Sequence, residues 1–187
     1  MTNNELKNII EALLMSSENP LTLDQIIDTF EIWQKPAHNL IKKILHELDL
    51  DYANRSIELV ELASGYCIQT RAQYGPWISR LQADRPPKYS KALLETLAII
   101  AYQQPVTRAD IEAIRGVSVS TSILKTLLER EWIRVGGYRD VPGKPAVYIT
   151  TKQFLDYFNL STIEQLPPLE DNTALTDSSQ IFAKEYT

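Results

Sequence analysis

A short pattern that occurs twice constrains the fold of this chain more than any other feature of its sequence. Residues 20–26 (PLTLDQI) and 105–111 (PVTRADI) share a proline, an aliphatic residue and a threonine, followed by three variable residues and an isoleucine. The two copies are 85 residues apart in a chain of 187 residues. Because this offset is close to half the length, the sequence predicts two similar domains in tandem.

The residues around each copy repeat a helical pattern as well. Upstream, an apolar face is predicted in each half, formed by Leu6, Ile9, Ile10, Leu13 and Leu14 and by Leu93, Leu94, Leu97, Ile100 and Ala101. Downstream, the same spacing occurs in Leu40, Ile41, Ile44, Leu45 and Leu48 and in Ile123, Leu124, Leu127 and Leu128. We therefore expect one helix before the shared pattern and another after it.

Between these two helices, each half should contain a shorter helix that begins at the shared threonine. Thr22 and Thr107 are the predicted N-caps. Gln25 and Asp110 follow three residues later, where their side chains can bond back to the cap. The shared pattern therefore predicts the start of the second helix in both domains.

The third helices are expected over residues 36–50 and 119–132, with Pro36 in the first turn of one and Ser118 or Ser120 capping the other. After each, the apolar spacing changes from helical to alternating, which predicts a β-hairpin. The expected strand pairs are Ile57, Leu59 and Glu61 against Tyr66, Ile68 and Thr70 around Ser64-Gly65, and residues 133–138 against 146–151 around the loop 139–145.

Three helices followed by a two-stranded hairpin form the winged-helix variant of the helix-turn-helix. The expected fold is therefore mainly α with small β-hairpins (α+β), arranged as two tandem winged-helix domains. Two generic small α+β domains are the alternative. The expected limits are 1–82 for the N-terminal domain, 83–89 for a linker, 90–166 for the C-terminal domain and 167–187 for a disordered acidic tail, with short helices over 74–81 and 153–158.

Side chains suited to catalysis or metal binding are sparse. Cys67 is the single cysteine, which excludes an internal disulfide and a thiolate-rich metal site. His38 and His46 are eight residues apart, too far for an i, i+4 metal pair. Residues 137–144 depart from a phosphate loop, because five residues separate the glycines and a proline follows the lysine. We expect no enzyme, no cofactor and no metal.

The N-terminus does not have the pattern of a signal peptide, and the longest apolar run is far shorter than a membrane span. Both observations predict a cytoplasmic protein without membrane contact.

Charge is unevenly distributed along the chain. Residues 1–82 carry 7 Lys and Arg against 11 Asp and Glu, residues 83–166 carry 11 against 9, and residues 167–187 carry 1 against 4. Neither half has the strongly basic face that neutralising phosphates requires. DNA contact is therefore expected to be weak or indirect, through the basic residues of the third helices and the wing, Lys42, Lys43, Lys125, Arg130, Arg134, Arg139 and Lys144.

The second helix of the C-terminal half carries a polar stripe. Ile111 and Ile114 are expected to face inward. The stripe has spacings of four and three, which suit surface ion pairs, and consists of Arg108, Glu112 and Arg115. Just before the helix come Tyr102, Gln103 and Gln104. Two interpretations stay open on spacing alone, a solvated helix face and the rim of a protein interface.

Residues 94–108 (LETLAIIAYQQPVTR), followed by Ile111-Glu112 and residues 114–117 (IRGV), closely resemble the signature of the segregation and condensation protein B family. Further matches are residues 10–14 with Pro20-Leu21, Gly65-Tyr66 with Thr70, residues 143–145 with Tyr148 and Thr150-Thr151, Phe154-Leu155 and Leu166-Pro167. The resemblance covers residues 5–168, with minor departures at Lys144 and Asn159, where the family often has arginine and glycine.

The resemblance implies a non-catalytic subunit of the bacterial condensin-like complex, homodimeric chiefly through its N-terminal domains. In this family the dimer grips the central segment of the kleisin subunit, segregation and condensation protein A, largely with the C-terminal domains. The kleisin bridges the heads of the structural-maintenance-of-chromosomes ATPase. This implies a role in chromosome condensation and segregation during cell division, in the cytoplasm at the nucleoid. Carried over to this sequence, the interface candidates are Tyr102, Gln103, Gln104, Arg108, Glu112 and Arg115.

A function of another class stays open on the residues alone, a tandem winged-helix transcription regulator that binds duplex DNA. A regulator should lose DNA binding when Lys42, Lys43, Lys125 or Arg134 is replaced. A kleisin-binding subunit should instead lose its protein partner when Arg108 or Arg115 is reversed in charge.

Overall fold

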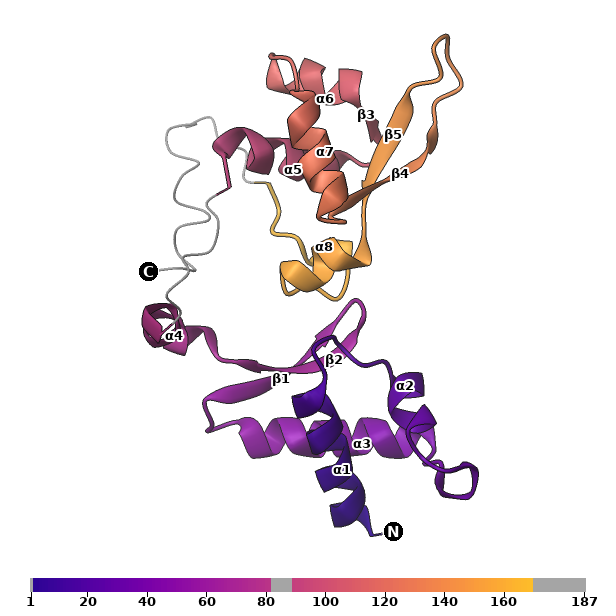
Figure 1. The fold of residues 1–187 in the computed structure, drawn as a ribbon, viewed down its shortest axis with the longest axis vertical. Helices are drawn as coiled ribbons and strands as arrows, with labels where there is room; N and C mark the ends of the chain where they lie inside the picture. Colours follow the sequence, from indigo (N-terminus) through magenta and orange to yellow (C-terminus); the bar gives the residue numbers. More distant parts are fainter. Residues whose placement is uncertain (1, 82–88, 170–187) are drawn as a thin grey trace. The chain divides into compact units, whose positions relative to one another are not determined.

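The structure is a computed structural model that describes residues 2–81 and 89–169. The chain divides into two compact units, residues 1–85 with 166–187 and residues 86–165 (Figure 1). They are called the N-terminal unit and the C-terminal unit here. The expected linker, residues 83–89, and the expected acidic tail, residues 167–187, lie outside the described residues except for Tyr89 and residues 167–169.

The N-terminal unit packs three helices against a hairpin, in the order that the repeat predicts. Its helices are α1 (Asn3–Ser16), α2 (Leu23–Asp28) and α3 (His38–Tyr52), with the 3₁₀ turn η1 (Ile32–Gln34) between α2 and α3. The hairpin is formed by β1 (Ile57–Leu62) and β2 (Gly65–Thr70), and is followed by η2 (Ala72–Tyr74) and α4 (Gly75–Leu81). The buried apolar core includes Leu6, Ile10, Leu14, Ile26, Ile41, Ile44, Leu45 and Leu48.

The C-terminal unit repeats this order. Its helices are α5 (Lys91–Gln103), α6 (Arg108–Arg115) and α7 (Thr121–Glu129). The strands are β3 (Val106–Thr107), β4 (Ile133–Tyr138) and β5 (Ala146–Thr150), followed by α8 (Lys152–Tyr157) and η3 (Ile163–Gln165). The core includes Leu93, Leu97, Ile100, Val106, Ile111, Val119, Leu124, Leu127 and Ile133. The predicted fold class is thus confirmed: mainly α with small hairpins, with a winged-helix arrangement in both units.

The predicted caps of the second helices are confirmed in both units. The Thr22 hydroxyl accepts from the Gln25 N–H at 3.1 Å, and the Gln25 side chain accepts from the Thr22 N–H at 2.8 Å. Thr107 and Asp110 form the same reciprocal pair at 3.3 and 2.8 Å. The repeated sequence pattern is therefore a capping box that starts a helix twice.

The first hairpin has the predicted register, with Leu59 opposite Ile68 and Glu61 opposite Tyr66. Its turn places Gly65 against the backbone of Leu21, in the connection between α1 and α2. A Cβ at Gly65 would lie 2.4 Å from the carbonyl carbon of Leu21, and its φ is +139°, so only glycine fits. This close approach lets Leu21 and Tyr66 exchange two backbone hydrogen bonds, at 2.9 and 2.8 Å.

The second wing gains a strand that the sequence analysis did not predict. β5 lies between β4 and the two-residue β3, so the order in this sheet is β3-β5-β4. In β3, Val106 pairs with Tyr148 and Thr107 with Val147. Because Thr107 is also the N-cap of α6, the strand joins the start of that helix to the wing.

The third helices differ from their predicted bounds. α3 begins at His38 with Ala37 as N-cap, so Pro36 lies before the helix and not in its first turn. α7 is capped by Ser120, one of the two predicted residues. It ends at Glu129 and not at Trp132, because Glu131 has a φ of +56°, which ends the helix and turns Trp132 into the core.

Two residues that were predicted to face inward lie on the surface instead: Ile9 is 39% exposed and Ile114 is 56% exposed. In α6, Ile111 is fully buried, and the next inward place is taken by Arg115, whose side chain is only 9% exposed. An ion pair with α5 makes that burial possible, as described below.

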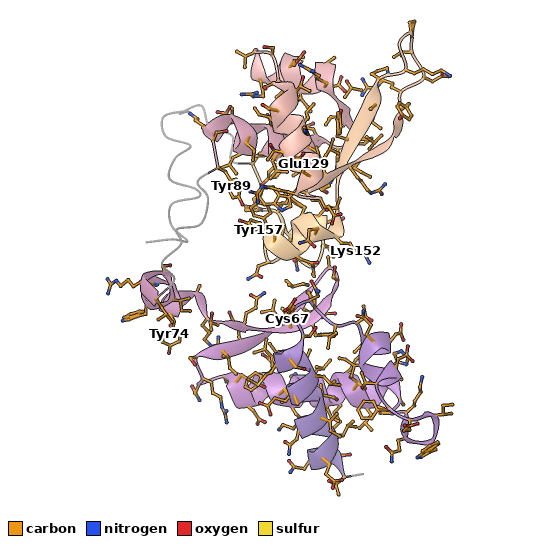
Figure 2. All side chains as sticks on the ribbon, in the orientation of Figure 1. Cys67, Tyr74, Tyr89, Glu129, Lys152 and Tyr157 are labelled. Carbon is orange, nitrogen blue, oxygen red and sulfur yellow. The ribbon has the colours of Figure 1, made fainter. Side chains whose placement is uncertain are left out.

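An aromatic cluster fixes α8 beneath the second wing. Trp132 is 2% exposed, and its ring lies 4.6 Å from that of Tyr157 and 5.1 Å from that of Tyr89, between centroids. Figure 2 shows Tyr89 and Tyr157 side by side, and their hydroxyl oxygens are 3.2 Å apart. The helix expected over 153–158 is α8, and the one expected over 74–81 is α4. Within residues 2–81 and 89–169, no helix has the length and apolar character needed to cross a membrane.

Candidate partner-binding surface

The six predicted interface residues lie on two adjoining helices of the C-terminal unit. Tyr102 and Gln103 end α5 and Gln104 is its C-cap, while Arg108, Glu112 and Arg115 belong to α6. The two helices pack against each other. Four of the six side chains, those of Gln104, Arg108, Glu112 and Arg115, form hydrogen bonds or ion pairs within the unit.

Gln104 ties the end of α5 to the wing. Its side-chain oxygen accepts from the Thr150 N–H at 2.7 Å and from the Thr150 hydroxyl at 3.0 Å. Its amide nitrogen donates to the Ala101 carbonyl at 3.4 Å. Because both ends of this amide are engaged, Gln104 joins the end of α5 to β5.

Arg108 and Glu112 hold the connection between α6 and α7. The Arg108 guanidinium donates to Glu112 at 3.0 Å, to the Thr121 hydroxyl at 3.3 Å and to the Val119 carbonyl. Glu112 also accepts from the Val119 N–H at 2.9 Å. That backbone hydrogen bond, followed by the one from Arg108, lowers the pKa of Glu112. The pair therefore fixes the loop 116–120, which Gly116 opens with a φ of +70°.

Arg115 does not extend the surface stripe that its spacing predicted. Its guanidinium donates to Glu95 of α5 at 3.2 Å, and its side chain is 9% exposed against 44% for Glu95. Its Nε is buried and has no hydrogen-bond partner within the described part of the chain. The buried stem of Arg115 thus packs α6 against α5, and Glu95 carries the ion pair to the surface.

Tyr102 belongs to a face of α5 that the sequence analysis found only in part. Glu95, Ala98, Ile99 and Tyr102 follow the i, i+3, i+4, i+7 spacing of one helix face, and we call them the α5 face. Ala98, Ile99 and Tyr102 are half-buried, and burial raises the pKa of the Tyr102 hydroxyl. The sequence analysis selected polar residues and so did not include Ala98 and Ile99 among its candidates. Their spacing, opposite the buried Leu93, Leu97 and Ile100, could have identified them.

The α5 face combines apolar contact area with polar groups at its ends. Ala98 and Ile99 lie between Tyr102 at one end and the Glu95–Arg115 ion pair at the other. Gln103, next to Tyr102, is exposed. Apolar centres with polar rims are typical of protein–protein interfaces. The surface suits a helix or an extended segment of another polypeptide.

Groups that could bind DNA phosphates are engaged in ion pairs within the C-terminal unit. Arg139 of the wing loop donates to both oxygens of Asp110, at 3.0 and 2.7 Å. These bonds, and then those from Thr107, lower the pKa of Asp110 to about 2. On α7, Lys125 lies 3.5 Å from Glu129. Both basic residues are therefore partly neutralised where a winged helix would approach a duplex.

The histidines are apart and differently placed. His38 pairs with Asp24 at 2.7 Å on the surface of the N-terminal unit, and His46 is exposed on α3. No group of three His, Cys, Asp or Glu residues in the described ranges is arranged to hold a metal ion.

The family model and the curated relatives agree on one family. The model of the family "Segregation and condensation complex subunit ScpB" matches residues 8–169, which span both units. A segregation and condensation protein B homolog from Coxiella burnetii is 52% identical over 179 residues, covering 96% of this chain and 86% of its own. Segregation and condensation protein B from Syntrophotalea carbinolica is 44% identical over 184 residues, covering 97% and 91%. The crystal structure of ScpB from Mycobacterium tuberculosis is 33% identical over 86% of this chain and 98% of its own, with a TM-score of 0.40.

Proposed function

This chain belongs to the family of the segregation and condensation complex subunit ScpB, and from that premise we propose that it is a homodimeric, non-catalytic subunit of a condensin-like complex. Its partner is the central segment of the kleisin subunit, segregation and condensation protein A. The N-terminal domain, residues 1–82, carries dimerisation, and the C-terminal domain, residues 90–166, carries the kleisin grip. The complex acts in chromosome condensation and segregation, in the cytoplasm at the nucleoid.

The α5 face is the observation that carries the proposal. It lies within residues 94–108, the segment whose sequence most closely resembles the family. Gln104, Arg108 and Glu112, which the resemblance offered as contacts, support the end of α5 and the loop beside α6 from within the unit. A surface fixed in this way loses little conformational entropy when a partner binds.

The mechanism is mechanical. A kleisin segment held on a rigid surface has fewer conformations, so the two ATPase heads that it connects engage with a different probability. ATP hydrolysis belongs to the ATPase subunit, and this chain supplies the restraint. DNA contact is weak or indirect, which is supported by the internal ion pairs of Arg139 and Lys125.

Light scattering on a sizing column tests the proposal, with the full chain run alone and mixed with the kleisin central segment. We expect a dimer that shifts to a larger complex. Tyr102→Ala or Ile99→Asp should weaken that complex at least about tenfold, because interface aromatics and central apolar contacts contribute most of the binding energy. Tyr138→Ala is the matched control, since Tyr138 lies on the wing and is 70% exposed.

An unshifted mixture would contradict the kleisin grip. Equal loss of binding in Tyr138→Ala and Tyr102→Ala would place the grip on the wing. Tight, sequence-dependent binding to duplex DNA that is lost in Arg134→Ala would favour the transcription regulator instead.

A further inference from the structure

The surface of α3 is basic over its first nine residues. Between positions 38 and 46, every exposed side chain of this helix is polar or basic, and none is acidic or apolar. At 3.6 residues per turn, these exposed positions fall within less than half of the helix circumference, away from the buried Ile41, Ile44 and Leu45. We call this surface the α3 cation face, and it consists of His38, Asn39, Lys42, Lys43 and His46.

The two lysines of the α3 cation face are available to an anion from outside. Within residues 2–81 and 89–169, neither Lys42 nor Lys43 forms an ion pair. Glu47 follows Lys43 by one turn of the helix, but the two side chains are not paired. Their charges are therefore not neutralised from within the described part of the unit.

The acids near this surface are paired with other groups or lie at the far end of the helix. On α2, Asp24 pairs with His38 at 2.7 Å, and Asp28 pairs with Lys35 at 2.6 Å. The acids of α3 itself all lie within residues 47–51, toward its C-terminus. The helix is thus basic where it begins and acidic where it ends.

The third helix of the C-terminal unit has no such surface. On α7, Lys125 lies 3.5 Å from Glu129, and Leu128, between them in the sequence, is 37% exposed. Arg130, just after the helix, stacks over the Tyr89 ring at 4.8 Å from its centroid. The two units therefore share the third helix but not its surface charge.

Duplex DNA suits the α3 cation face better than a protein partner does. Protein interfaces have an apolar centre, and this face has no exposed apolar side chain. Lysine ammonium, imidazole and amide groups can all donate hydrogen bonds to phosphate oxygens or base edges. In helix-turn-helix folds the recognition helix lies in the major groove, with its N-terminal residues toward the bases. In the N-terminal unit that helix is α3, and its basic residues occupy the N-terminal part.

We infer that the N-terminal unit contacts duplex DNA directly and without sequence preference, with α3 at the major groove and with Lys42 and Lys43 against phosphates. This goes beyond the proposed function, in which DNA contact is weak or indirect, because it makes the contact direct and assigns it to one helix. The net charge of −4 over residues 1–82 keeps the contact weak, since the other acids of the unit repel phosphates.

Fluorescence anisotropy of a short labelled duplex tests the inference, with the full chain and salt from about 50 to about 200 mM. We expect a dissociation constant of about 10⁻⁴ to 10⁻⁶ M, the range of sequence-independent binding. Lys42→Ala and Lys43→Ala should each weaken binding at least about threefold and reduce the slope of log affinity against log salt by about 1 for each copy bound. Alanine is a strong helix former, so neither change should unfold α3.

Lys125→Ala is the matched control, because Lys125 lies on the corresponding helix α7 but is paired with Glu129. It should change the affinity for the duplex less than about twofold. Each variant is also mixed with the kleisin central segment. Because Lys42, Lys43 and Lys125 all lie outside the α5 face, the kleisin complex should form equally well in every case. Failure of the DNA contact is thereby distinguishable from failure of the proposed function.

Four results would overturn the inference. Unchanged affinity and salt slope in both Lys42→Ala and Lys43→Ala would exclude α3 as the contact. A loss in Lys125→Ala equal to that in Lys42→Ala would show that the assignment to one helix is wrong. Equal affinity for single-stranded DNA would exclude docking at a duplex groove. A polyglutamate peptide that binds as tightly as the duplex, with the same dependence on both lysines, would assign the face to an acidic protein segment.

Discussion

The two units use the same capping box with different chemistry. In the N-terminal unit the third helical residue is Gln25, whose neutral amide bonds back to Thr22. In the C-terminal unit it is Asp110, whose carboxylate bonds to Thr107 and also receives the Arg139 guanidinium from the wing. A single change from amide to carboxylate thus connects the start of α6 to the wing loop. The backbone arrangement of the capping box is the same in both units. The charge of Asp110 adds the contact with Arg139, for which the neutral Gln25 has no counterpart.

The connections between the second and third helices differ in the same way. In the C-terminal unit, Arg108 and Glu112 fix the loop 116–120 through backbone groups of Val119. In the N-terminal unit the loop 29–37 carries Ile32 and Trp33 at 84% and 78% exposure, with the exposed pair Lys35–Asp28 beside it. In the C-terminal unit, charged side chains form hydrogen bonds that fix the connecting loop. In the N-terminal unit, the corresponding loop exposes apolar side chains.

The wing turns should show the largest difference in stability. Gly65→Ala should cost about 3 kcal/mol, because the added methyl group would overlap the Leu21 carbonyl at a φ of +139°. Gly143→Ala should cost about 1 kcal/mol, since φ is +86° but nothing lies within 4 Å of the added carbon. Urea unfolding followed by circular dichroism measures both. Equal losses in the two variants would show that the contact with Leu21 is not what requires glycine.

The helix connections should differ next. Arg108→Ala should destabilise the C-terminal unit by about 2 kcal/mol, because it removes charge-assisted hydrogen bonds to the loop 116–120. Lys35→Ala, in the corresponding region of the N-terminal unit, should cost less than about 0.5 kcal/mol, since that pair is exposed. Fluorescence of Trp132, which is 2% exposed, measures the loss in the C-terminal unit, and urea unfolding followed by circular dichroism measures the loss caused by Lys35→Ala. Similar losses in both variants would remove the contrast between the loops.

The smallest expected effect is a pH-dependent change in stability that arises from the Thr107–Asp110 capping box of α6. The pKa of Asp110 is lowered to about 2 by Arg139 and Thr107, from an ordinary value of 3.8. A carboxyl whose pKa is lowered by folding stabilises the native state above its ordinary pKa, and that contribution decreases as the pH falls toward 2. The stability difference between the unaltered chain and Asp110→Asn should therefore be present at pH 5 and shrink between pH 4 and pH 2. Gln25→Ala should show no such change over this range, and a pH-independent difference for Asp110→Asn would contradict the role of the ionised pair.

Much of the fold could be predicted because its signals are local. The threonine caps, the register around Gly65 and the switch from helical to alternating spacing each depend on residues within one or two turns of the chain. The limits of α7 could not be predicted, because the positive φ of Glu131 follows from the burial of Trp132 among Tyr89, Tyr157 and Phe158. The short strand β3 was missed because two residues carry no detectable alternation.

The sequence placed the interface candidates on α5 and α6, but polarity alone did not separate the buried side chains from the exposed ones. Spacing alone placed Ile114 inside and Arg115 in a surface stripe, whereas Ile114 is 56% exposed and the Arg115 side chain is 9% exposed. The reason is Glu95 of α5, which accepts a hydrogen bond from the largely buried Arg115 guanidinium at 3.2 Å. Without the packing of α5 on α6, both arrangements satisfy the helical period equally well.

The sequence by itself determined two tandem winged helices and the family to which the chain belongs, because repeats, caps and apolar periods are set by near neighbours in the chain. Only the tertiary structure decided which polar residues of α5 and α6 are internal supports and which remain exposed. The reason is that a charged side chain becomes buried only where a distant element supplies its counter-charge or hydrogen-bond partner, as Glu95 does for Arg115 and Val119 for Arg108 and Glu112.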